Sequence, residues 1–279
     1  MGCLNDSDEW KHWFANIHLS GPCNRRCYFC IGQHMMALDS LNSLDTPPSE
    51  MSGMGKFIEE VNLRGIKEID LTGTNTDPCL YRHHVALVDF LRESVPGAIL
   101  GIRTNGSAHV HEIGLYDKGS ITICSTDYAT NLEMMGGPPP DLGELAFHAD
   151  LSKFKINCVL GPRNANKANV LGLVSLANKY GMTRLNLREP YGQAHVGYFF
   201  MDEPEGEILQ GTVPIWTVDG VSVAYWDVHT VGVRSVNLYA NGRVSMDYPV
   251  TRGHVENGIV RPQKEFEGHA RRTKQWVRT

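Results

Sequence analysis

The chain has 279 residues and a formal net charge of −5, with 42% hydrophobic and 20% charged residues. This balance is ordinary for a folded domain and argues against a protein that binds nucleic acid through bulk positive charge. No apolar run approaches the roughly 20 residues of a membrane helix, and the polar, acidic residues 1–11 do not resemble a secretory signal. We therefore expect a cytoplasmic protein with no membrane partner, whose cysteines serve as ligands or catalysts before they form disulfides.

The first strand-like run, Ile17–Ser20, follows an N-terminal segment and leads into three of the seven cysteines. Cys23, Cys27 and Cys30 have the spacing C-x3-C-x2-C. A loop of this length can wrap its thiolates around one face of a cubane iron–sulfur cluster. Three ligands for four irons leave one iron open, and an open metal position is a place to bind a substrate or a cofactor.

Zinc is the alternative metal for these cysteines. A structural zinc site needs four ligands, usually from two paired units such as C-x2-C. The chain has no second pair, and neither Cys3 nor His34 has the expected spacing to complete such a site. The cysteine pattern therefore favours an iron–sulfur cluster over zinc.

Further strand-like runs alternate with helical patterns as far as about residue 192. The strands are expected at Glu68–Leu71, Ile99–Arg103, Ile121–Cys124, Phe154–Leu160 and Arg184–Leu187. The helices are expected at Gly55–Leu63, His83–Glu93 and Asn166–Tyr180. Alternation of this kind is typical of an α/β fold with a parallel sheet. Each strand ends in a polar loop that contains Gly, Pro or Asn, and in a parallel barrel the site collects at these ends.

The cysteine run, with Phe29 immediately before Cys30, resembles the C-x3-C-x-aromatic-C signature of the radical S-adenosylmethionine (radical SAM) superfamily. The resemblance implies a [4Fe–4S] cluster held by Cys23, Cys27 and Cys30. It also implies S-adenosylmethionine (SAM) as cofactor, a 5′-deoxyadenosyl radical as the reactive species, and a reductase or flavodoxin-type protein as electron donor. Finally, it implies a partial (β/α)6 TIM-like barrel over about Ile17 to Gly192.

Several loops can be matched to the superfamily one residue at a time. The stretch Gly73–Pro78 stands where relatives carry Gly-Gly-Glu-Pro, and its Thr-Asn-Thr-Asp-Pro part is similar to relatives of spore photoproduct lyase, which act on thymine in DNA. The resemblance implies SAM contacts at Gly73, Thr74, Asn75, Ser125, Asn157 and Arg188. For each polar residue the alternative is a helix cap or a turn.

Three residues are candidates for direct participation in the reaction. Cys124 is expected to end a strand and could donate a hydrogen atom, although an inert buried cysteine is the competing interpretation. Arg188 and Glu189 could meet the substrate at a strand end.

No cysteine follows Cys158, so we expect a single cluster, and enzymes that mature peptides with additional clusters become a poorer match.

The pattern changes from about residue 206. Short strands are expected at Thr212–Val218, Val221–Trp226, Arg234–Tyr239 and Arg243–Tyr248. Asp219-Gly220 and Asn241-Gly242 are strong hairpin signals, because both pairs tolerate positive φ. We therefore expect three parts: an N-terminal segment 1–15, a barrel over 16–205, and a C-terminal β-hairpin appendage with a basic tail over 206–279. The hairpins are expected to cover the open side of the barrel.

The tail is the main candidate for contact with phosphates. It contains Arg271, Arg272 and Lys274 among six basic residues, against two glutamates, from residue 261 onward. A solvated C-terminal helix or a frayed tail is the competing interpretation.

Three substrate hypotheses follow. The first is a modified thymine base in DNA. Here the chain resembles the phage radical SAM isomerases of thymidine hypermodification, which convert nitrogen-linked glycyl-thymidine to the carbon-linked form, and this implies a protein acting in the cytoplasm of the phage's host. The second is a small-molecule or nucleotide cofactor precursor, as in molybdopterin or deazapurine biosynthesis. The third is a non-catalytic iron–sulfur electron carrier, which has little need for six barrel units.

Overall fold

The computed structural model describes residues 13–33, 41–190, 197–198, 200–208, 213–227, 234–246, 254–256 and 259–261. Eleven strands form one sheet in the order β11-β10-β1-β2-β3-β4-β5-β6-β9-β8-β7. The first six strands run parallel. Their bounds are Phe14–Leu19 (β1), Glu68–Gly73 (β2), Ile99–Thr104 (β3), Lys118–Thr122 (β4), Phe154–Val159 (β5) and Arg184–Arg188 (β6). The α/β class with a partial TIM-like barrel is therefore confirmed.

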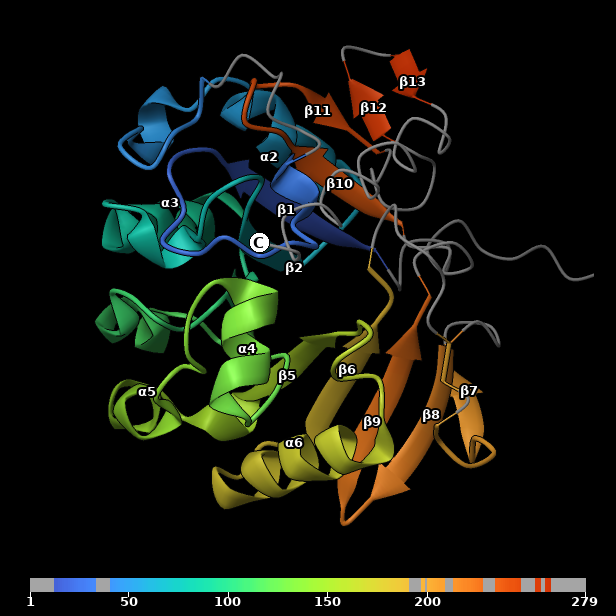
Figure 1. The fold of residues 1–279 in the computed structure, drawn as a ribbon. Helices are drawn as coiled ribbons and strands as arrows, with labels where there is room; N and C mark the ends of the chain where they lie inside the picture. Colours follow the sequence, from blue (N-terminus) through green and yellow to red (C-terminus); the bar gives the residue numbers. More distant parts are fainter. Residues whose placement is uncertain are drawn as a thin grey trace, which may run out of the picture.

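Among the described residues, five α-helices lie between the strands and cover one side of the sheet (Figure 1). They are Met54–Leu63 (α2), His84–Ser94 (α3), Tyr128–Met135 (α4), Leu142–His148 (α5) and Lys167–Lys179 (α6). Alternate strand residues such as Ile17, Leu71 and Ile156 are fully buried in the core beneath these helices. Because strand side chains alternate in direction, the residues between them point to the opposite, inner face of the sheet.

The inner face differs from the helix-covered face in being polar. Its fully or nearly fully buried side chains include Asn16, His18, Asp70, Ser120 and Asn157. A row of buried polar groups on one face is costly unless each finds a partner. This face is therefore the natural place for a polar ligand.

The C-terminal strands extend both edges of the parallel sheet. Strand β9 (Val221–Trp226) pairs in parallel with β6 and forms an antiparallel hairpin with β8 (Val213–Val218), which in turn pairs with β7 (Gly206–Ile208). At the other edge, β10 (Ser235–Leu238) runs parallel to β1 and antiparallel to β11 (Val244–Ser245). A short separate ladder joins β12 (His254–Glu256) to β13 (Ile259–Arg261).

The turn chemistry of the β8–β9 hairpin follows the sequence. Asp219 and Gly220 both have positive φ, at 48° and 81°, which is the conformation that a tight two-residue turn requires. The predicted C-terminal hairpin is thus confirmed. Pairing through β9 also covers the edge that a six-stranded open barrel would leave at β6, as expected for an edge that needs protection.

Two details of the predicted elements are wrong. Strand β4 begins at Lys118 and ends at Thr122, whereas the apolar run predicted Ile121–Cys124. Its first residues are small or polar because Ser120 lies on the polar inner face and Gly119 faces Phe154, whose ring would lie 2.3 Å from an added Cβ. Helices α4 and α5 were not predicted, although Asp127 and Asp141 cap their N-termini through their side chains.

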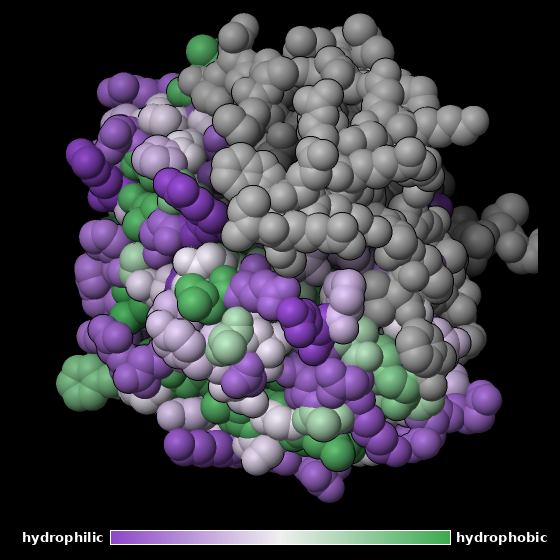
Figure 2. All heavy atoms as spheres, in the orientation of Figure 1, coloured by the Kyte–Doolittle hydropathy of each residue, from purple (hydrophilic) through white to green (hydrophobic). Residues whose placement is uncertain are grey.

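On the face shown in Figure 2, the coloured hydrophobic residues form small patches among hydrophilic ones. Such scattered patches are normal for protein surfaces. Within the described part of the chain, no helix is long and apolar enough to cross a membrane.

Candidate iron–sulfur and cofactor site

The loop with the three cysteines follows β1 directly and lies at the carboxyl ends of the parallel strands. Cys23 is exposed, and Cys27 and Cys30 are partly buried; none is in a disulfide. The loop has no α-helix or strand of its own, apart from the 3-10 turn Ile31–Gln33 that follows it. Contacts with neighbouring strand ends must therefore set its shape.

The loop after β2 makes the first set of contacts. The Thr76 hydroxyl donates to the Pro22 carbonyl at 2.7 Å, and the Gly21 N–H donates to Asn75 Oδ1 at 3.2 Å. Gly32 lies so close to this loop that an added Cβ would be 2.0 Å from the Thr74 carbonyl oxygen. The Thr-Asn-Thr stretch therefore clamps both ends of the cysteine run.

The loop after β3 makes the second set. Asn105 donates to Asn24 Oδ1 at 2.9 Å, and Asn24 donates in turn to Ser107 Oγ at 3.0 Å. Arg25 Nε also donates to Ser107 Oγ, at 2.9 Å. Asn105 and Ser107 thus hold the residues between the first two cysteines.

The end of α4 makes the third set. The N–H groups of Arg26 and Tyr28 donate to the carbonyls of Met135 and Met134, at 3.3 and 3.2 Å. These carbonyls belong to the last turn of α4, where backbone acceptors lack intrahelical partners. The cysteine loop satisfies them, and α4 positions the backbone on either side of Cys27.

Asp77 is a site residue that the sequence reasoning missed. It is almost fully buried, and its carboxylate accepts from Thr104 Oγ1 at 2.7 Å, the Asn105 N–H at 2.6 Å and the Cys79 N–H at 3.0 Å. Burial raises the pKa of Asp77, while these donors act in the opposite direction. Its position before Pro78, at the start of a 3-10 turn, was the available signal, because Asp is a favoured cap there.

The three thiols lie close enough to influence one another's ionisation. Burial raises the pKa of Cys27 strongly, with further increases from Cys30, Cys124 and Cys23. The pKa of Cys23 is likewise raised, first by burial, with smaller contributions from Asp77 and Cys30. A group of thiols with raised pKa values needs nearby positive charge to become thiolates, and metal binding supplies it.

Three cysteine thiols on one loop are a donor set that an iron–sulfur cluster can use, because they can serve three of its irons. Among the described residues, no three His, Cys, Asp or Glu side chains are arranged to hold one metal ion. Cys3 and His34, which could complete a zinc site, lie outside the described residues.

The residues predicted to contact SAM lie within or shortly after β2, β4, β5 and β6. The Thr74 hydroxyl and Asn157 Oδ1 are buried without a hydrogen-bond partner among the described residues. Asn75 holds the cysteine loop, as described above, and Gly73 approaches the Thr76 carbonyl so closely that a Cβ would be 1.8 Å away. Ser125 Oγ accepts from the Asp127 N–H at 3.1 Å, which is the turn interaction of the competing interpretation.

The three candidates for direct participation lie in different surroundings. Cys124 is fully buried and packs with Met134 and Met135 against Cys27, and burial raises its pKa strongly. Glu189 is buried and accepts from the Gly197 N–H at 2.6 Å and from the Tyr225 hydroxyl. Arg188, one residue earlier, is partly exposed at the end of β6. The contacts favour a packing role for Cys124 and a positioning role for Glu189, and their catalytic roles stay predictions.

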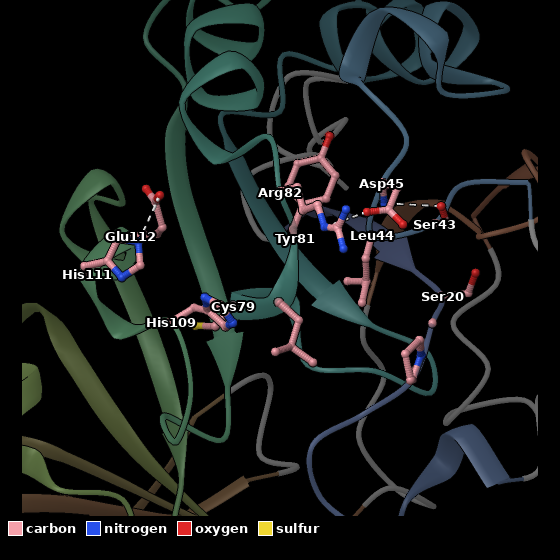
Figure 3. A pocket seen from close by; sticks show the side chains of 13 residues that line it. Ser20, Ser43, Leu44, Asp45, Cys79, Tyr81, Arg82, His109, His111 and Glu112 are labelled. Atoms are coloured by element: carbon pink, nitrogen blue, oxygen red, sulfur yellow. Dashed lines mark hydrogen bonds and ion pairs between the residues drawn. The ribbon is translucent and has the colours of Figure 1, made fainter.

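A hollow of about 490 Å³ is lined in part by the residues that lead into the cysteine loop (Figure 3). Its walls include residues 20–22, which lead into this loop, together with Tyr81, His109, His111 and Glu112. The Arg82–Asp45 and His111–Glu112 pairs lie at its rim. None of the predicted site residues lines it.

Neither protein-family models nor curated proteins match the chain. Among solved structures, SuiB of Streptococcus suis bound to its precursor peptide SuiA matches 70% of this chain and 43% of its own, with 16% identity and a TM-score of 0.50. SuiB bound to S-adenosylmethionine matches 68% and 40%, with 17% identity and a TM-score of 0.49. TYW1 with a lysine–pyruvate adduct matches 71% and 73%, with 15% identity and a TM-score of 0.41.

The chain thus spans less than half the length of the SuiB structures that it matches. At these identities the likeness concerns the fold. The chain shares the α/β fold of SuiB over about two thirds of its own length.

Proposed function

We propose that the chain is a radical SAM enzyme with one [4Fe–4S] cluster bound by Cys23, Cys27 and Cys30. The observation that carries the proposal is the placement of these cysteines, on one loop held at the carboxyl ends of parallel strands by three neighbouring segments. Site residues of parallel barrels gather at this end. The fold shared with SuiB, which was crystallised with S-adenosylmethionine, adds support.

The chain's own residues have definable parts in such a site. When bound, the cluster and SAM would supply the radical chemistry that removes a hydrogen atom from the substrate. Thr74 and Asn157 offer buried polar atoms without partners and are suited to bind SAM. Asp77, Asn105 and Ser107 hold the cysteine loop in place through the hydrogen bonds described above.

For the substrate we propose a thymine base in DNA that carries a nitrogen-linked glycine. The reaction would be an isomerisation to the carbon-linked form, through hydrogen abstraction, migration and hydrogen return. Three features support this substrate: the stretch Thr74–Pro78, which is similar to relatives that act on thymine, the basic residues from Arg261 onward, and the single cysteine triplet. A base must leave the stack before such an enzyme can reach it.

A small-molecule or nucleotide precursor of a cofactor is the second candidate. It is favoured by the Leu187-Arg188-Glu189-Pro190 stretch and by the polar inner face, which suits a compact polar ligand. On this alternative the chain would bind a purine nucleotide and would not need DNA.

The test is anaerobic reconstitution with iron and sulfide, followed by dithionite and SAM, with and without DNA that contains glycyl-thymidine. We expect 5′-deoxyadenosine to form and, in the presence of this DNA, the retention time of the modified nucleoside to change at constant mass. Deoxyadenosine that forms equally without the DNA would transfer the proposal to the nucleotide alternative. Failure to cleave SAM with a full cluster would contradict the enzyme class and favour an electron carrier.

Contact with the DNA backbone has its own test. Arg271, Arg272 and Lys274 lie outside the described residues and are proposed to bind phosphates. Replacing all three by Gln should weaken DNA binding and reduce its salt dependence, because each phosphate contact releases counterions. Binding with the same salt dependence in this variant would remove the tail from the proposal.

A further inference from the structure

The inner face of the sheet carries more positive than negative charge. Three basic residues alternate along their strands with the residues buried beneath the helices: Arg103 on β3, Lys155 on β5 and Arg188 on β6. The acidic residue Asp70 on β2 lies near them. Asp70 Oδ2 accepts from Arg103 Nε at 2.9 Å and from Arg103 Nη2 at 2.6 Å. Asp70 is thus already paired with Arg103, and the pKa of Asp70 is lowered, against the effect of burial, by Arg103 and Lys118.

Lys155 has a different environment. Within the described part of the chain, its ammonium has no hydrogen bond or ion pair. Burial and the charges of Arg103, Arg184 and Arg188 lower the pKa of Lys155 to about 7, and Asp70 offsets them only in part. A half-buried cation among other cations is unfavourable until an anion joins it.

Ser120 provides a second observation at the same place. In the parallel register, Ser120 lies directly opposite Arg103 on one side and Lys155 on the other. It is 2% exposed, and its hydroxyl has no partner among the described residues. A buried hydroxyl beside an unpaired ammonium forms a pair of donors suited to one oxyanion.

We propose that Lys155 and Ser120 bind an anionic group of the substrate, a carboxylate or a phosphate, on the inner face of the sheet. The inference rests on the proposed function, because it assumes that the substrate binds against this face of the sheet. The ion pair between Arg103 and Asp70 borders the subsite and fixes the position of the Arg103 guanidinium. The Cζ atom of Arg103 also lies 5.3 Å from the centroid of the Phe14 ring. A carboxylate there suits a glycine attached to a base, and a phosphate suits a nucleotide.

The subsite can be tested without catalysis. The reconstituted protein is treated with a neutral amine-acetylating ester at fixed ionic strength, and acetylation of each lysine is followed by peptide mass spectrometry. The probes are acetate and inorganic phosphate, each compared with chloride. At an anion concentration of about four times Kd, acetylation of Lys155 should slow about fivefold, because one fifth of the protein remains free. Lys153, an exposed neighbour on the adjoining 3-10 turn, should be unaffected.

The outcomes distinguish a carboxylate from a phosphate as the bound group, and they distinguish failure of the anion site from failure of the proposed enzyme class. Protection of Lys155 by acetate alone identifies a carboxylate subsite, protection by phosphate alone identifies a phosphate subsite, and protection by both supports an anion site of either kind. Acetylation of Lys155 that neither anion slows would overturn the inference, even if the protein cleaves SAM. Protection in a protein that does not cleave SAM would keep the anion site and reject the enzyme class.

Variants supply a second measurement. Any anion that protects Lys155 should raise the thermal unfolding midpoint of the wild type and of the Lys155→Arg variant. It should not raise the midpoint of the Lys155→Gln variant. Lys153→Gln is the matched control and should respond as the wild type does. An equal rise in Lys155→Gln would place the anion elsewhere and overturn the assignment.

Discussion

Asp77 connects three backbone segments beneath the cysteine loop. Its carboxylate binds the start of the turn at Cys79 and two groups of the loop after β3, at Thr104 and Asn105. Asn105 then holds Asn24, between the first two cysteines. One buried side chain is therefore linked to the geometry of the proposed cluster site through two hydrogen bonds in series.

Replacing Asp77 by Asn should destabilise the protein by about 1–3 kcal/mol, because the new amide would face the Asn105 N–H as a second donor. Urea unfolding measures this effect, and iron content after reconstitution should fall with it. Asp141→Asn is the matched control: Asp141 caps α5 at an exposed position, and Asn caps as well as Asp does. Equal stability of the two variants would contradict the role given to Asp77.

His18 makes stability depend on pH. It is buried on the inner face, stacks on Tyr239 with ring centroids 5.1 Å apart, and has no partner for Nε2 among the described residues. Burial lowers the pKa of His18 to about 4, Arg103 lowers it further, and a hydrogen bond with Asn237 acts in the opposite direction. The folded protein therefore keeps this imidazole neutral where the unfolded chain would protonate it.

The free energy of unfolding should fall between pH 6.5 and pH 4. In that range the unfolded chain binds a proton at His18 and the native state does not, so the stability present above pH 6.5 is progressively lost, by about 3 kcal/mol. Urea unfolding at several pH values should show a smaller loss in His18→Gln than in the wild type. His111→Gln, at an exposed position, is the control, and a wild-type loss unchanged by His18→Gln would contradict the assignment. Burial also lowers the pKa of His84, so that part of the loss should remain in both variants.

The cluster ligands could be predicted from the sequence, whereas the residues that depend on contacts between strands could not. The cysteine ligands share one short loop, so their spacing alone identifies them. Asp77, Ser120 and Lys155 acquire their importance from partners on other strands, and a single sequence does not reveal which strands pair. Conversely, loop position alone also selects residues whose side chains stabilise the backbone, as Ser125 does for the Asp127 N–H and Glu189 does for the Gly197 N–H.

At the scale of elements, close backbone approach joins the cysteine loop to its neighbours. The turn Ile31–Gln33 lies against the loop after β2 at Gly32, where there is no room for a side chain. The sequence predicted the parallel strands well, because their apolar runs face the helices. It missed α4, whose last carbonyls bind the cysteine loop, because that helix has only eight residues and is followed directly by two glycines and three prolines.

Replacing Gly32 by Ala should push the cysteine loop away from β2, because the new Cβ would lie 2.0 Å from the Thr74 carbonyl oxygen. We expect a loss of about 1–3 kcal/mol in urea unfolding and a lower iron content after reconstitution. The matched control is Gly55→Ala in α2, where a Cβ has open space and should stabilise the helix by up to about 1 kcal/mol. Full iron content in Gly32→Ala would show that the contact does not shape the site.

At the scale of the whole molecule, one sheet joins the N-terminal strands to C-terminal strands. Strand β10 lies beside β1, and β9 lies beside β6, so segments distant in sequence close both edges of the six-stranded core (Figure 1). The hairpin turns in the sequence predicted antiparallel pairs but not these parallel partners, because long-range pairing leaves little local pattern. The resulting arrangement places a polar inner face beneath a cysteine loop, which is the setting that the proposed chemistry needs.

The most direct measurement of the central claim is the iron and sulfide content of the anaerobically reconstituted protein, together with its visible absorption. We predict about four irons per chain in the wild type, with loss of the absorption and of SAM cleavage in Cys23→Ala, Cys27→Ala and Cys30→Ala. Cys79→Ala, at a buried cysteine outside the loop, should keep both. A cluster that persists in any of the three loop variants, or that is lost equally in Cys79→Ala without unfolding, would contradict the assignment of the ligands and with it the proposed enzyme class.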